Sequence, residues 1–308
     1  MDKDFVSVAD ATREEMVALF ETARRLKKRQ SAPDEGQKLR GKTAALIFEK
    51  PSLRTRVTFE TGMTQLGGHA IYLATLDIRM GKRESVGDVA RNLSRWVDAI
   101  VARTFSHDTV VELASAASVP VINALSDHEH PCQALADYLT IWERYPRPER
   151  LRISYVGDGN NVCHSLLLGA GILGLNLTVA SPKAYAPKEP VVAQARALAG
   201  VSGGEITIVQ DPSEGVADAD VVYTDVFASM GQESEAEERA RVFQPYQVNS
   251  ELLRNAASKA VVMHCLPAHR GEEITDEVLD GPQSIVLDQA ENRLHAQNAL
   301  LLKLMGGS

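Results

Sequence analysis

Short runs rich in Val, Ile and Leu alternate along the chain with longer segments whose apolar residues recur at helical spacing. The short runs predict β-strands at Ala44–Phe48, Ala70–Leu73, Ala99–Ala102, Val119–Asn123, Ile153–Val156, Leu177–Ala180, Ile206–Val209, Val221–Thr224, Val261–His264 and Ile285–Leu287. Strands that alternate with helices of about ten residues indicate βαβ units, whose parallel sheets are covered on both faces. The pattern therefore predicts an α/β fold.

The same pattern predicts where the chain divides. A helix predicted over Cys132–Arg144 ends at Tyr145-Pro146-Arg147-Pro148, where two prolines and neighbouring charges mark a boundary. A chain of 308 residues also suits two domains of about 150 residues each. We therefore predict two doubly wound domains with mainly parallel sheets, joined by helices, over residues 1–146 and 147–290.

Two predicted helices have no partner strand. They are Thr12–Arg29 at the start of the chain and Arg293–Met305 at its end. Such helices can pack together or bridge the two domains. We expect the C-terminal segment, residues 291–308, to pack back on the first domain.

Groups that can do chemistry follow the ends of several predicted strands. In an open parallel sheet, ligands bind beyond the carboxyl ends of the strands. The groups found there are Ser52–Thr55, Arg103, His130–Gln133, Gly157–Asn161, Asp225 and His264–Pro267. We expect an active site in the interdomain cleft, where all of these groups could meet.

The turn Pro51–Val57 joins a predicted strand to a predicted helix that stops at Gly67-Gly68. Ser52 is placed as the N-cap of this helix and Thr55 in its first turn. The apolar positions of the helix are Val57, Phe59, Met63 and Leu66. Unpaired N–H groups at a helix start, two hydroxyls and Arg54 together suit a compact dianion such as phosphate. The alternative is that Ser52 only caps the helix.

Arg103 stands at the end of an apolar strand. An arginine in that position is better explained as an anion-binding side chain than as a solvated one, because its planar guanidinium matches the geometry of phosphate or carboxylate. His130 precedes a predicted helix, and Gln133 follows one turn later. A histidine can donate to a carbonyl oxygen and a glutamine can bond an amide, so this pair suits one small polar group. A partly exposed capping histidine is the alternative.

Gly157-Asp158-Gly159-Asn160-Asn161-Val162 follows a strand and opens a helix, as a dinucleotide-binding fingerprint does. Val162 replaces the third glycine, and no acidic residue stands at a strand end about 20 residues later. A tight turn that presents the Asn161 amide is therefore favoured. An NAD(P)-dependent oxidoreductase remains the alternative from another class of enzyme.

Asp225 follows a strand and suits the ammonium group of a substrate. It precedes Ser229-Met230-Gly231 and a polar stretch, Gln232–Arg241, which could be a lid or an exposed helix. Cys265, between His264 and Leu266, is either a buried structural cysteine or a reactive one. Residue types near His130 and Cys265 could also bind a metal, but their spacing fits no common zinc pattern.

The composition narrows the class of protein. A net charge of −8 argues against nucleic acid and against an anionic membrane surface as partners. No apolar run approaches the roughly 20 residues that span a bilayer, and no signal peptide is visible. Three cysteines fit a reducing compartment better than a disulfide framework. We expect a cytoplasmic enzyme.

Taken together, these motifs resemble the aspartate/ornithine carbamoyltransferase family, and its ornithine-specific members in particular. The resemblance covers nearly the whole chain and rests on Ser52–Arg56, Arg103, His130–Gln133, Asn161, Asp225, Ser229–Gly231, His264–Pro267 and Arg293. It implies transfer of the carbamoyl group of carbamoyl phosphate to the δ-amine of L-ornithine, which gives L-citrulline and phosphate in arginine metabolism. It implies no metal and no organic cofactor.

The resemblance also implies roles for single residues. Residues 1–146 would bind carbamoyl phosphate and residues 147–290 ornithine. Carbamoyl phosphate would be held by Ser52, Leu53, Arg54, Thr55, Arg103, His130, Gln133, Cys265, Leu266 and Arg293, with the carbonyl of Leu266 close to the carbamoyl group. Ornithine would be bound by Asn161, Asp225, Ser229 and Met230. Cys265, Asp225, His130 and Arg54 would be the catalytic residues, and Cys265 would help the δ-amine to lose its proton.

Two positions depart from the family pattern. Threonine is usual where this chain has Leu53, so one hydroxyl contact is missing, which a backbone N–H could replace. Glutamine is frequent where Arg79 stands, in a segment that reaches a neighbouring subunit's site in the family; Arg79, Lys82 or Arg83 could serve instead. The resemblance implies a homotrimer or a multiple of trimers. Within the family, the alternatives for the acceptor are putrescine, N-acetylornithine and aspartate.

Overall fold

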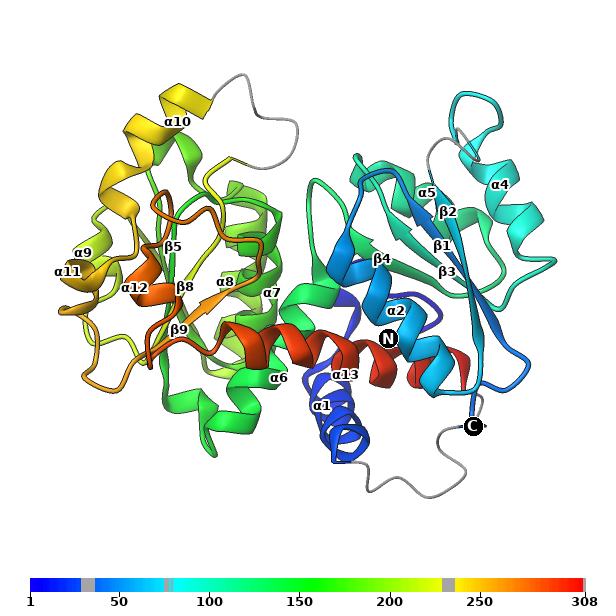
Figure 1. Ribbon diagram of the computed structural model, residues 1–308, viewed down its shortest axis with the longest axis horizontal. Coiled ribbons are helices and arrows are strands. Elements are labelled where there is room, and N and C mark those ends of the chain that lie inside the picture. The colour runs from blue at the N-terminus through cyan, green and yellow to red at the C-terminus, as the bar shows by residue number, and fades with distance from the viewer. Residues whose placement is uncertain (29–36, 75–77, 79, 229–235, 307–308) are drawn as a thin grey trace. The chain divides into compact units, whose positions relative to one another are not determined.

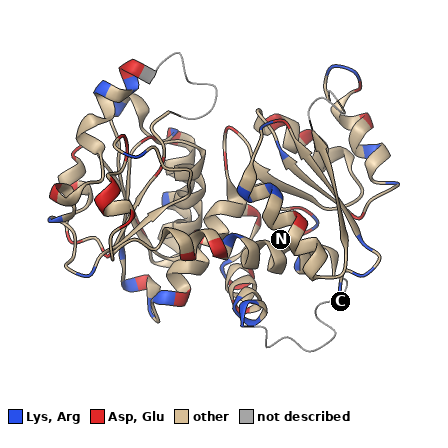
Figure 2. Cartoon of the chain, in the orientation of Figure 1, with Lys and Arg blue, Asp and Glu red and all other residues tan. Residues whose placement is uncertain are grey.

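The computed structural model describes residues 1–28, 37–74, 78, 80–228 and 236–306. The chain forms two compact units (Figure 1). Unit 1 comprises Met1–Glu143 and Glu291–Ser308, and unit 2 comprises Arg144–Ala290. No helix within the described ranges is long and apolar enough to cross a membrane. Lys and Arg are interspersed with Asp and Glu on the helices of each unit (Figure 2).

The sheet of unit 1 has four parallel strands in the order β2-β1-β3-β4. These are β1 (Thr43–Phe48), β2 (His69–Ala74), β3 (Ala99–Arg103) and β4 (Val121–Leu125). Phe48 and Arg103 lie opposite each other in the register of β1 and β3. The turn after β1 and the Arg103 side chain therefore belong to the same edge of the sheet.

Helices cover both faces of this sheet. They are α1 (Arg13–Lys27), α2 (Leu53–Gln65), α4 (Val86–Leu93), α5 (His107–Ala116), α6 (Pro131–Arg144) and the α13 helix (Val286–Met305), with a short 3₁₀ helix at Val8–Asp10. Apolar side chains of α4 and α5 pack with the strands in one core cluster. The right-handed crossover that contains α2 places this helix on the opposite face. Gly62 of α2 faces Asn298 of α13, where a Cβ atom would lie 2.2 Å from Asn298 Oδ1.

The sheet of unit 2 has five parallel strands in the order β7-β6-β5-β8-β9. They are β5 (Arg152–Val156), β6 (Asn176–Ala180), β7 (Glu205–Val209), β8 (Val221–Thr224) and β9 (Val261–His264). The direction of the strand order reverses between β5 and β8. In such sheets the reversal point is where ligands bind, and Asn160 and Asp225 follow these two strands.

The helices of unit 2 are α7 (Asn161–Leu173), α8 (Glu189–Ser202), α9 (Pro212–Gly215), α10 (Ala236–Phe243), α11 (Ser250–Leu253) and α12 (Asp276–Leu279). Short 3₁₀ helices lie at Pro148–Arg150, Lys183–Tyr185 and Gln244–Tyr246. Apolar residues of α10, α11 and α12 pack with β5, β8 and β9 in a second core cluster. Phe227 stacks on Phe243 within it, with ring centroids 4.7 Å apart.

The predicted α/β class with two mainly parallel sheets is confirmed, and the first nine predicted strands fall within one or two residues of β1–β9. The strand predicted at Ile285–Leu287 is wrong, because α13 begins at Val286. A three-residue apolar run cannot by its period be told from a buried helix segment. Arg293 consequently lies inside α13 and does not open it. Of the four apolar positions named for α2, Phe59, Met63 and Leu66 are buried, and Val57 is 49% exposed.

Candidate active-site residues

The turn after β1 forms as its sequence predicts. Ser52 is extended and caps α2, its Oγ accepting a hydrogen bond from Thr55 N at 3.3 Å. Thr55 is buried, Arg54 is half-buried, and the Leu53 side chain is 74% exposed. Because the aliphatic side chain of Leu53 has no hydrogen-bond donor, this residue can offer an anion only its backbone N–H, one of the first N–H groups of α2 that have no acceptor within the helix.

A buried arginine connects three helices of unit 1. Arg293 of α13 donates from NH1 to Gln133 Oε1 of α6 at 2.5 Å, and from NH2 to Thr55 Oγ1 of α2 at 3.1 Å. All three side chains are at most 2% exposed. The amide Nε2 of Gln133 donates to Asp137 Oδ1 at 2.8 Å. This chain of hydrogen bonds places a guanidinium, an amide and a hydroxyl in one cluster.

His130 and Arg103 are both buried in unit 1. Burial lowers the pKa of His130 well below its usual 6.5, and the nearby charges of Arg293 and Arg103 lower it further. The imidazole is therefore neutral at pH 7, with one N–H donor and one acceptor nitrogen. Burial has the opposite effect on the Cys132 thiol, whose pKa rises to about 12. Cys132 is thus an inert structural thiol, its Sγ donating to Asn123 O at 3.4 Å.

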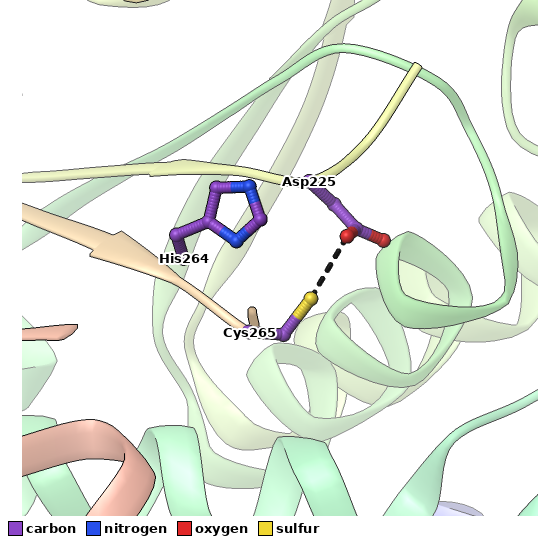
Figure 3. A group of neighbouring side chains, drawn as sticks. All are labelled: Asp225, His264 and Cys265. Carbon is purple, nitrogen blue, oxygen red and sulfur yellow. Dashed lines mark hydrogen bonds between the residues drawn. The ribbon is translucent and has the colours of Figure 1, made fainter. Parts of the chain in front are cut away.

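In unit 2, Asp225 and Cys265 point toward each other from the ends of β8 and β9 (Figure 3). Cys265 Sγ donates to Asp225 Oδ1 at 2.8 Å. Asp225 is buried, and its Oδ1 also accepts from Val226 N at 2.8 Å while Oδ2 accepts from Asn160 Nδ2 at 2.7 Å. These donors hold the carboxylate in one orientation, with one oxygen aimed at the thiol.

His264 supports the segment that follows Cys265. Its Nδ1 accepts from Leu266 N at 2.8 Å, so the ring proton is on Nε2, which donates to Glu273 Oε1 at 2.9 Å. Leu266 has a φ of 57°, and its bond to Pro267 is cis. Asp225, His264 and Cys265 could together offer three ligands to a metal ion. However, both nitrogens of His264 are already engaged, so a metal would have to break one of these hydrogen bonds.

The glycine turn after β5 leads into the N-cap of α7. Asn160 caps α7, its Oδ1 accepting from Val162 N at 2.9 Å and Cys163 N at 3.1 Å. A Cβ atom on Gly159 would lie 2.1 Å from Pro187 N, so the close approach of the chain itself explains the need for this glycine. Asn161 is half-buried in the first turn of α7.

Sequence reasoning missed four groups that organise these residues. Asp137 lies four residues after Gln133, a helical spacing that could have revealed the pair. Asn160, Glu273 and the buried ion pair of Asp158 with Arg239, whose atoms Oδ2 and NH1 are 3.0 Å apart, depend on distant contacts. No local pattern signals those. Ser229, Met230 and Arg79 lie outside the described residues, and Lys82 and Arg83 are exposed.

Buried, hydrogen-bonded polar groups at the strand ends of two parallel sheets define an enzyme of the two-domain α/β class. The carbamoyl-P binding domain of the aspartate/ornithine carbamoyltransferases matches residues 3–143, and their Asp/Orn binding domain matches residues 149–304. The chain belongs to the aspartate/ornithine carbamoyltransferase family.

Similar proteins and a similar solved structure are ornithine carbamoyltransferases. The chain is 54% identical over 303 residues to an ornithine carbamoyltransferase of Anoxybacillus flavithermus, covering 98% of this chain and 96% of the relative. It is 53% identical over 305 residues to the anabolic ornithine carbamoyltransferase of Pyrococcus furiosus, covering 99% and 97%. A solved structure of ornithine carbamoyltransferase from P. furiosus superimposes with a TM-score of 0.96, at 53% identity, over 99% of this chain and 98% of that one.

Proposed function

We propose that the chain transfers the carbamoyl group of carbamoyl phosphate to the δ-amine of L-ornithine, giving L-citrulline and phosphate. The observation that carries the proposal is the Arg293 cluster of unit 1, which joins Thr55 and Gln133 beside a neutral His130. The names of the relatives support ornithine as the acceptor. The name of the P. furiosus relative supports a role in arginine synthesis.

Residues of unit 1 suit the phosphoryl group of the donor. The start of α2 offers unpaired N–H groups and the positive end of a helix dipole. Arg103 and Arg54 add charge, and an arginine fork can bind two phosphate oxygens at once. We assign phosphate binding to Ser52, the backbone of Leu53, Arg54, Thr55 and Arg103. Unit 1 would thus be the carbamoyl phosphate-binding domain, as expected for residues 1–146.

The carbamoyl group needs donors for its oxygen and acceptors for its NH₂ group. Neutral His130 offers a donor N–H, and Gln133 offers its amide oxygen. We assign carbamoyl binding to His130, Gln133, Arg293, Cys265 and the carbonyl of Leu266. Attack on the carbonyl carbon builds negative charge on its oxygen, which His130, Thr55 and Arg54 can stabilise from fixed positions.

Ornithine cannot attack while its δ-amine is protonated, and such an amine has a pKa of about 10.4. The Cys265–Asp225 pair is the proposed proton acceptor, because the 2.8 Å hydrogen bond lets Asp225 draw the thiol proton away from Sγ. Sγ, once deprotonated, takes one proton from the δ-ammonium group, and the freed δ-nitrogen lone pair bonds to the carbamoyl carbon. The bond from that carbon to the phosphate oxygen breaks, and phosphate leaves with the bonding electrons and with the second proton of the δ-nitrogen.

The α-ammonium and α-carboxylate of ornithine are assigned to Asn161, Asp225, Ser229 and Met230. Asp225 already accepts from Cys265, Val226 N and Asn160. A carboxylate has about four lone-pair sites, which leaves room for one further donor. Unit 2 would thus be the ornithine-binding domain, as expected for residues 147–290.

A homotrimer, or a multiple of trimers, is part of the proposal. Large apolar side chains of unit 1 are exposed at Leu53, Val57, Ile71 and Trp96, but singly exposed apolar side chains are common, so the proposal rests on the resemblance to the family. A cytoplasmic setting is supported by the three free thiols. With a net charge of −8, neither nucleic acid nor an anionic membrane is a proposed partner.

Purified protein incubated with carbamoyl phosphate and L-ornithine tests the function. Citrulline and phosphate should form in a one-to-one ratio, without added metal or nucleotide. Release of phosphate without citrulline would contradict the proposal. Saturable binding of NADH, followed by its fluorescence, would instead support the oxidoreductase alternative.

A further inference from the structure

The amide of Gln133 is held at both ends. Arg293 NH1 donates to its oxygen at 2.5 Å, and its nitrogen donates to Asp137 Oδ1 at 2.8 Å. Gln133 and Asp137 are i and i+4 on α6, and they are 1% and 0% exposed. Arg293 and Asp137 therefore act on opposite ends of one buried amide.

Both contacts select the same orientation of the amide. A rotation by 180° would place the amide nitrogen against the guanidinium, which can only donate. It would also place the amide oxygen against a carboxylate oxygen, which can only accept unless it is protonated. Buried polar groups left without a partner cost on the order of 1–3 kcal/mol each, so the reversed amide is strongly disfavoured.

The orientation matters for the proposed donor substrate. An amide oxygen has two lone pairs, and Arg293 uses one. The other can accept from the NH₂ group of a carbamoyl phosphate, whereas the methyl group of an acyl phosphate such as acetyl phosphate has no hydrogen to donate. A reversed amide would present N–H to that NH₂ group and repel it.

We propose that Asp137 is a positioning residue that makes the site selective for carbamoyl phosphate over other acyl phosphates, by fixing the amide oxygen of Gln133 toward the donor's NH₂ group. The inference rests on the proposed function of this site. Asp137 itself touches Gln133 and need not touch the substrate. Because the phosphoryl group is assigned to other residues, Asp137 should influence recognition of the carbamoyl group alone.

The test compares Asp137→Leu with Asp137→Asn. Leucine removes the acceptor while filling the space, and asparagine keeps an oxygen that can still accept from Gln133. Thr140→Val is the matched control, since it removes other buried hydrogen bonds of α6, from Asn292 Nδ2 to Thr140 Oγ1 at 2.9 Å and from Thr140 Oγ1 to Ala136 O at 2.8 Å. Circular dichroism and thermal unfolding check the fold. If Asp137→Leu does not fold, Asp137→Ala removes the same acceptor.

Three constants are measured for each variant: KM for carbamoyl phosphate, and the inhibition constants of acetyl phosphate and inorganic phosphate. For Asp137→Leu we expect KM to rise about 10- to 100-fold, the value of one lost buried hydrogen bond. Both inhibition constants should stay within about twofold, so selectivity falls by the same factor. Asp137→Asn and Thr140→Val should remain close to wild type.

Other results would overturn the inference. If all three constants of Asp137→Leu rose together, Asp137 would have a general structural role. If the ratio of the acetyl phosphate inhibition constant to the carbamoyl phosphate KM were the same in Asp137→Leu as in the wild type, Asp137 would not govern selectivity. A wild-type protein without carbamoyl transfer would refute the proposed function, which is a separate result.

Discussion

Replacing Cys265 by serine tests the proposed proton acceptor. Its Sγ lies 2.8 Å from Asp225 Oδ1, and the carboxylate is oriented by Asn160 and Val226 N. Serine keeps a hydrogen-bond donor to Asp225, but its hydroxyl is a far poorer proton acceptor than a thiolate. The substitution should leave ornithine binding nearly intact and slow the chemical step.

The size of the effect follows from the protonation of ornithine. With a δ-amine pKa of about 10.4, only about one ornithine molecule in 250 has a neutral δ-amine at pH 8. If the variant can use only ornithine whose δ-amine is already neutral, its kcat at pH 8 should fall roughly 100-fold. This loss lies within the range of about 10²–10⁴ for general acid–base catalysis. The rate should then rise about tenfold per pH unit toward pH 10, because the neutral fraction does so.

Steady-state rates with saturating carbamoyl phosphate, measured from pH 6 to 10, give this profile. Cys163→Ser is the matched control, since burial raises the pKa of that thiol well above its usual value and leaves it protonated. The control should keep the wild-type profile. A Cys265→Ser profile that coincided with wild type would remove Cys265 from the mechanism.

Three further predictions concern other buried ionisable side chains. Arg103→Ala should raise the carbamoyl phosphate KM by at least about tenfold, because a charged contact with the phosphate is lost. Its circular dichroism spectrum should be unchanged. An unchanged KM would exclude Arg103 from the site. Because the pKa of His130 is lowered in the folded protein, the unfolded chain takes up a proton first as pH falls below about 6.5, so stability should decrease there. Urea titrations at pH 7.5 and 5.5 should show that the free energy of unfolding falls less between these pH values in His130→Asn than in the wild type. An equal fall in both proteins would contradict the assignment of His130 as a buried neutral imidazole. Arg239→Ala leaves Asp158 buried without its cation, which should lower the free energy of unfolding by about 3–5 kcal/mol in urea titrations. A loss below about 1 kcal/mol would show that the pair contributes little.

Local patterns were sufficient for most of the fold. Nine strands and the cap at Ser52 could be predicted because strand and helix periodicity and N-cap hydrogen bonding depend on residues that are close together in sequence. The strand predicted at Ile285–Leu287 failed for the same reason: three apolar residues look alike in a strand and in the first turn of α13. Family membership, indicated by the order and spacing of the motifs, is confirmed by both domain matches.

The organisation of the candidate site was only partly predictable. Asp225 and Cys265 could be named as strand-end residues, but their 2.8 Å contact depends on how β8 and β9 pair. Asn160 lies 65 residues before its partner Asp225, and Glu273 lies 9 residues after its partner His264. No local periodicity of the sequence predicts these hydrogen bonds. The roles of the site residues in catalysis remain predictions that the variants above address.

A competition among amine acceptors tests the central claim most directly. Purified protein is given carbamoyl phosphate with L-ornithine, putrescine, N-acetylornithine or L-aspartate, and both phosphate and the carbamoylated product are quantified. The account predicts that kcat/KM for L-ornithine exceeds that of every other acceptor, because Asp225 and Asn161 suit a free α-amino acid. A higher kcat/KM for putrescine, N-acetylornithine or L-aspartate would contradict it.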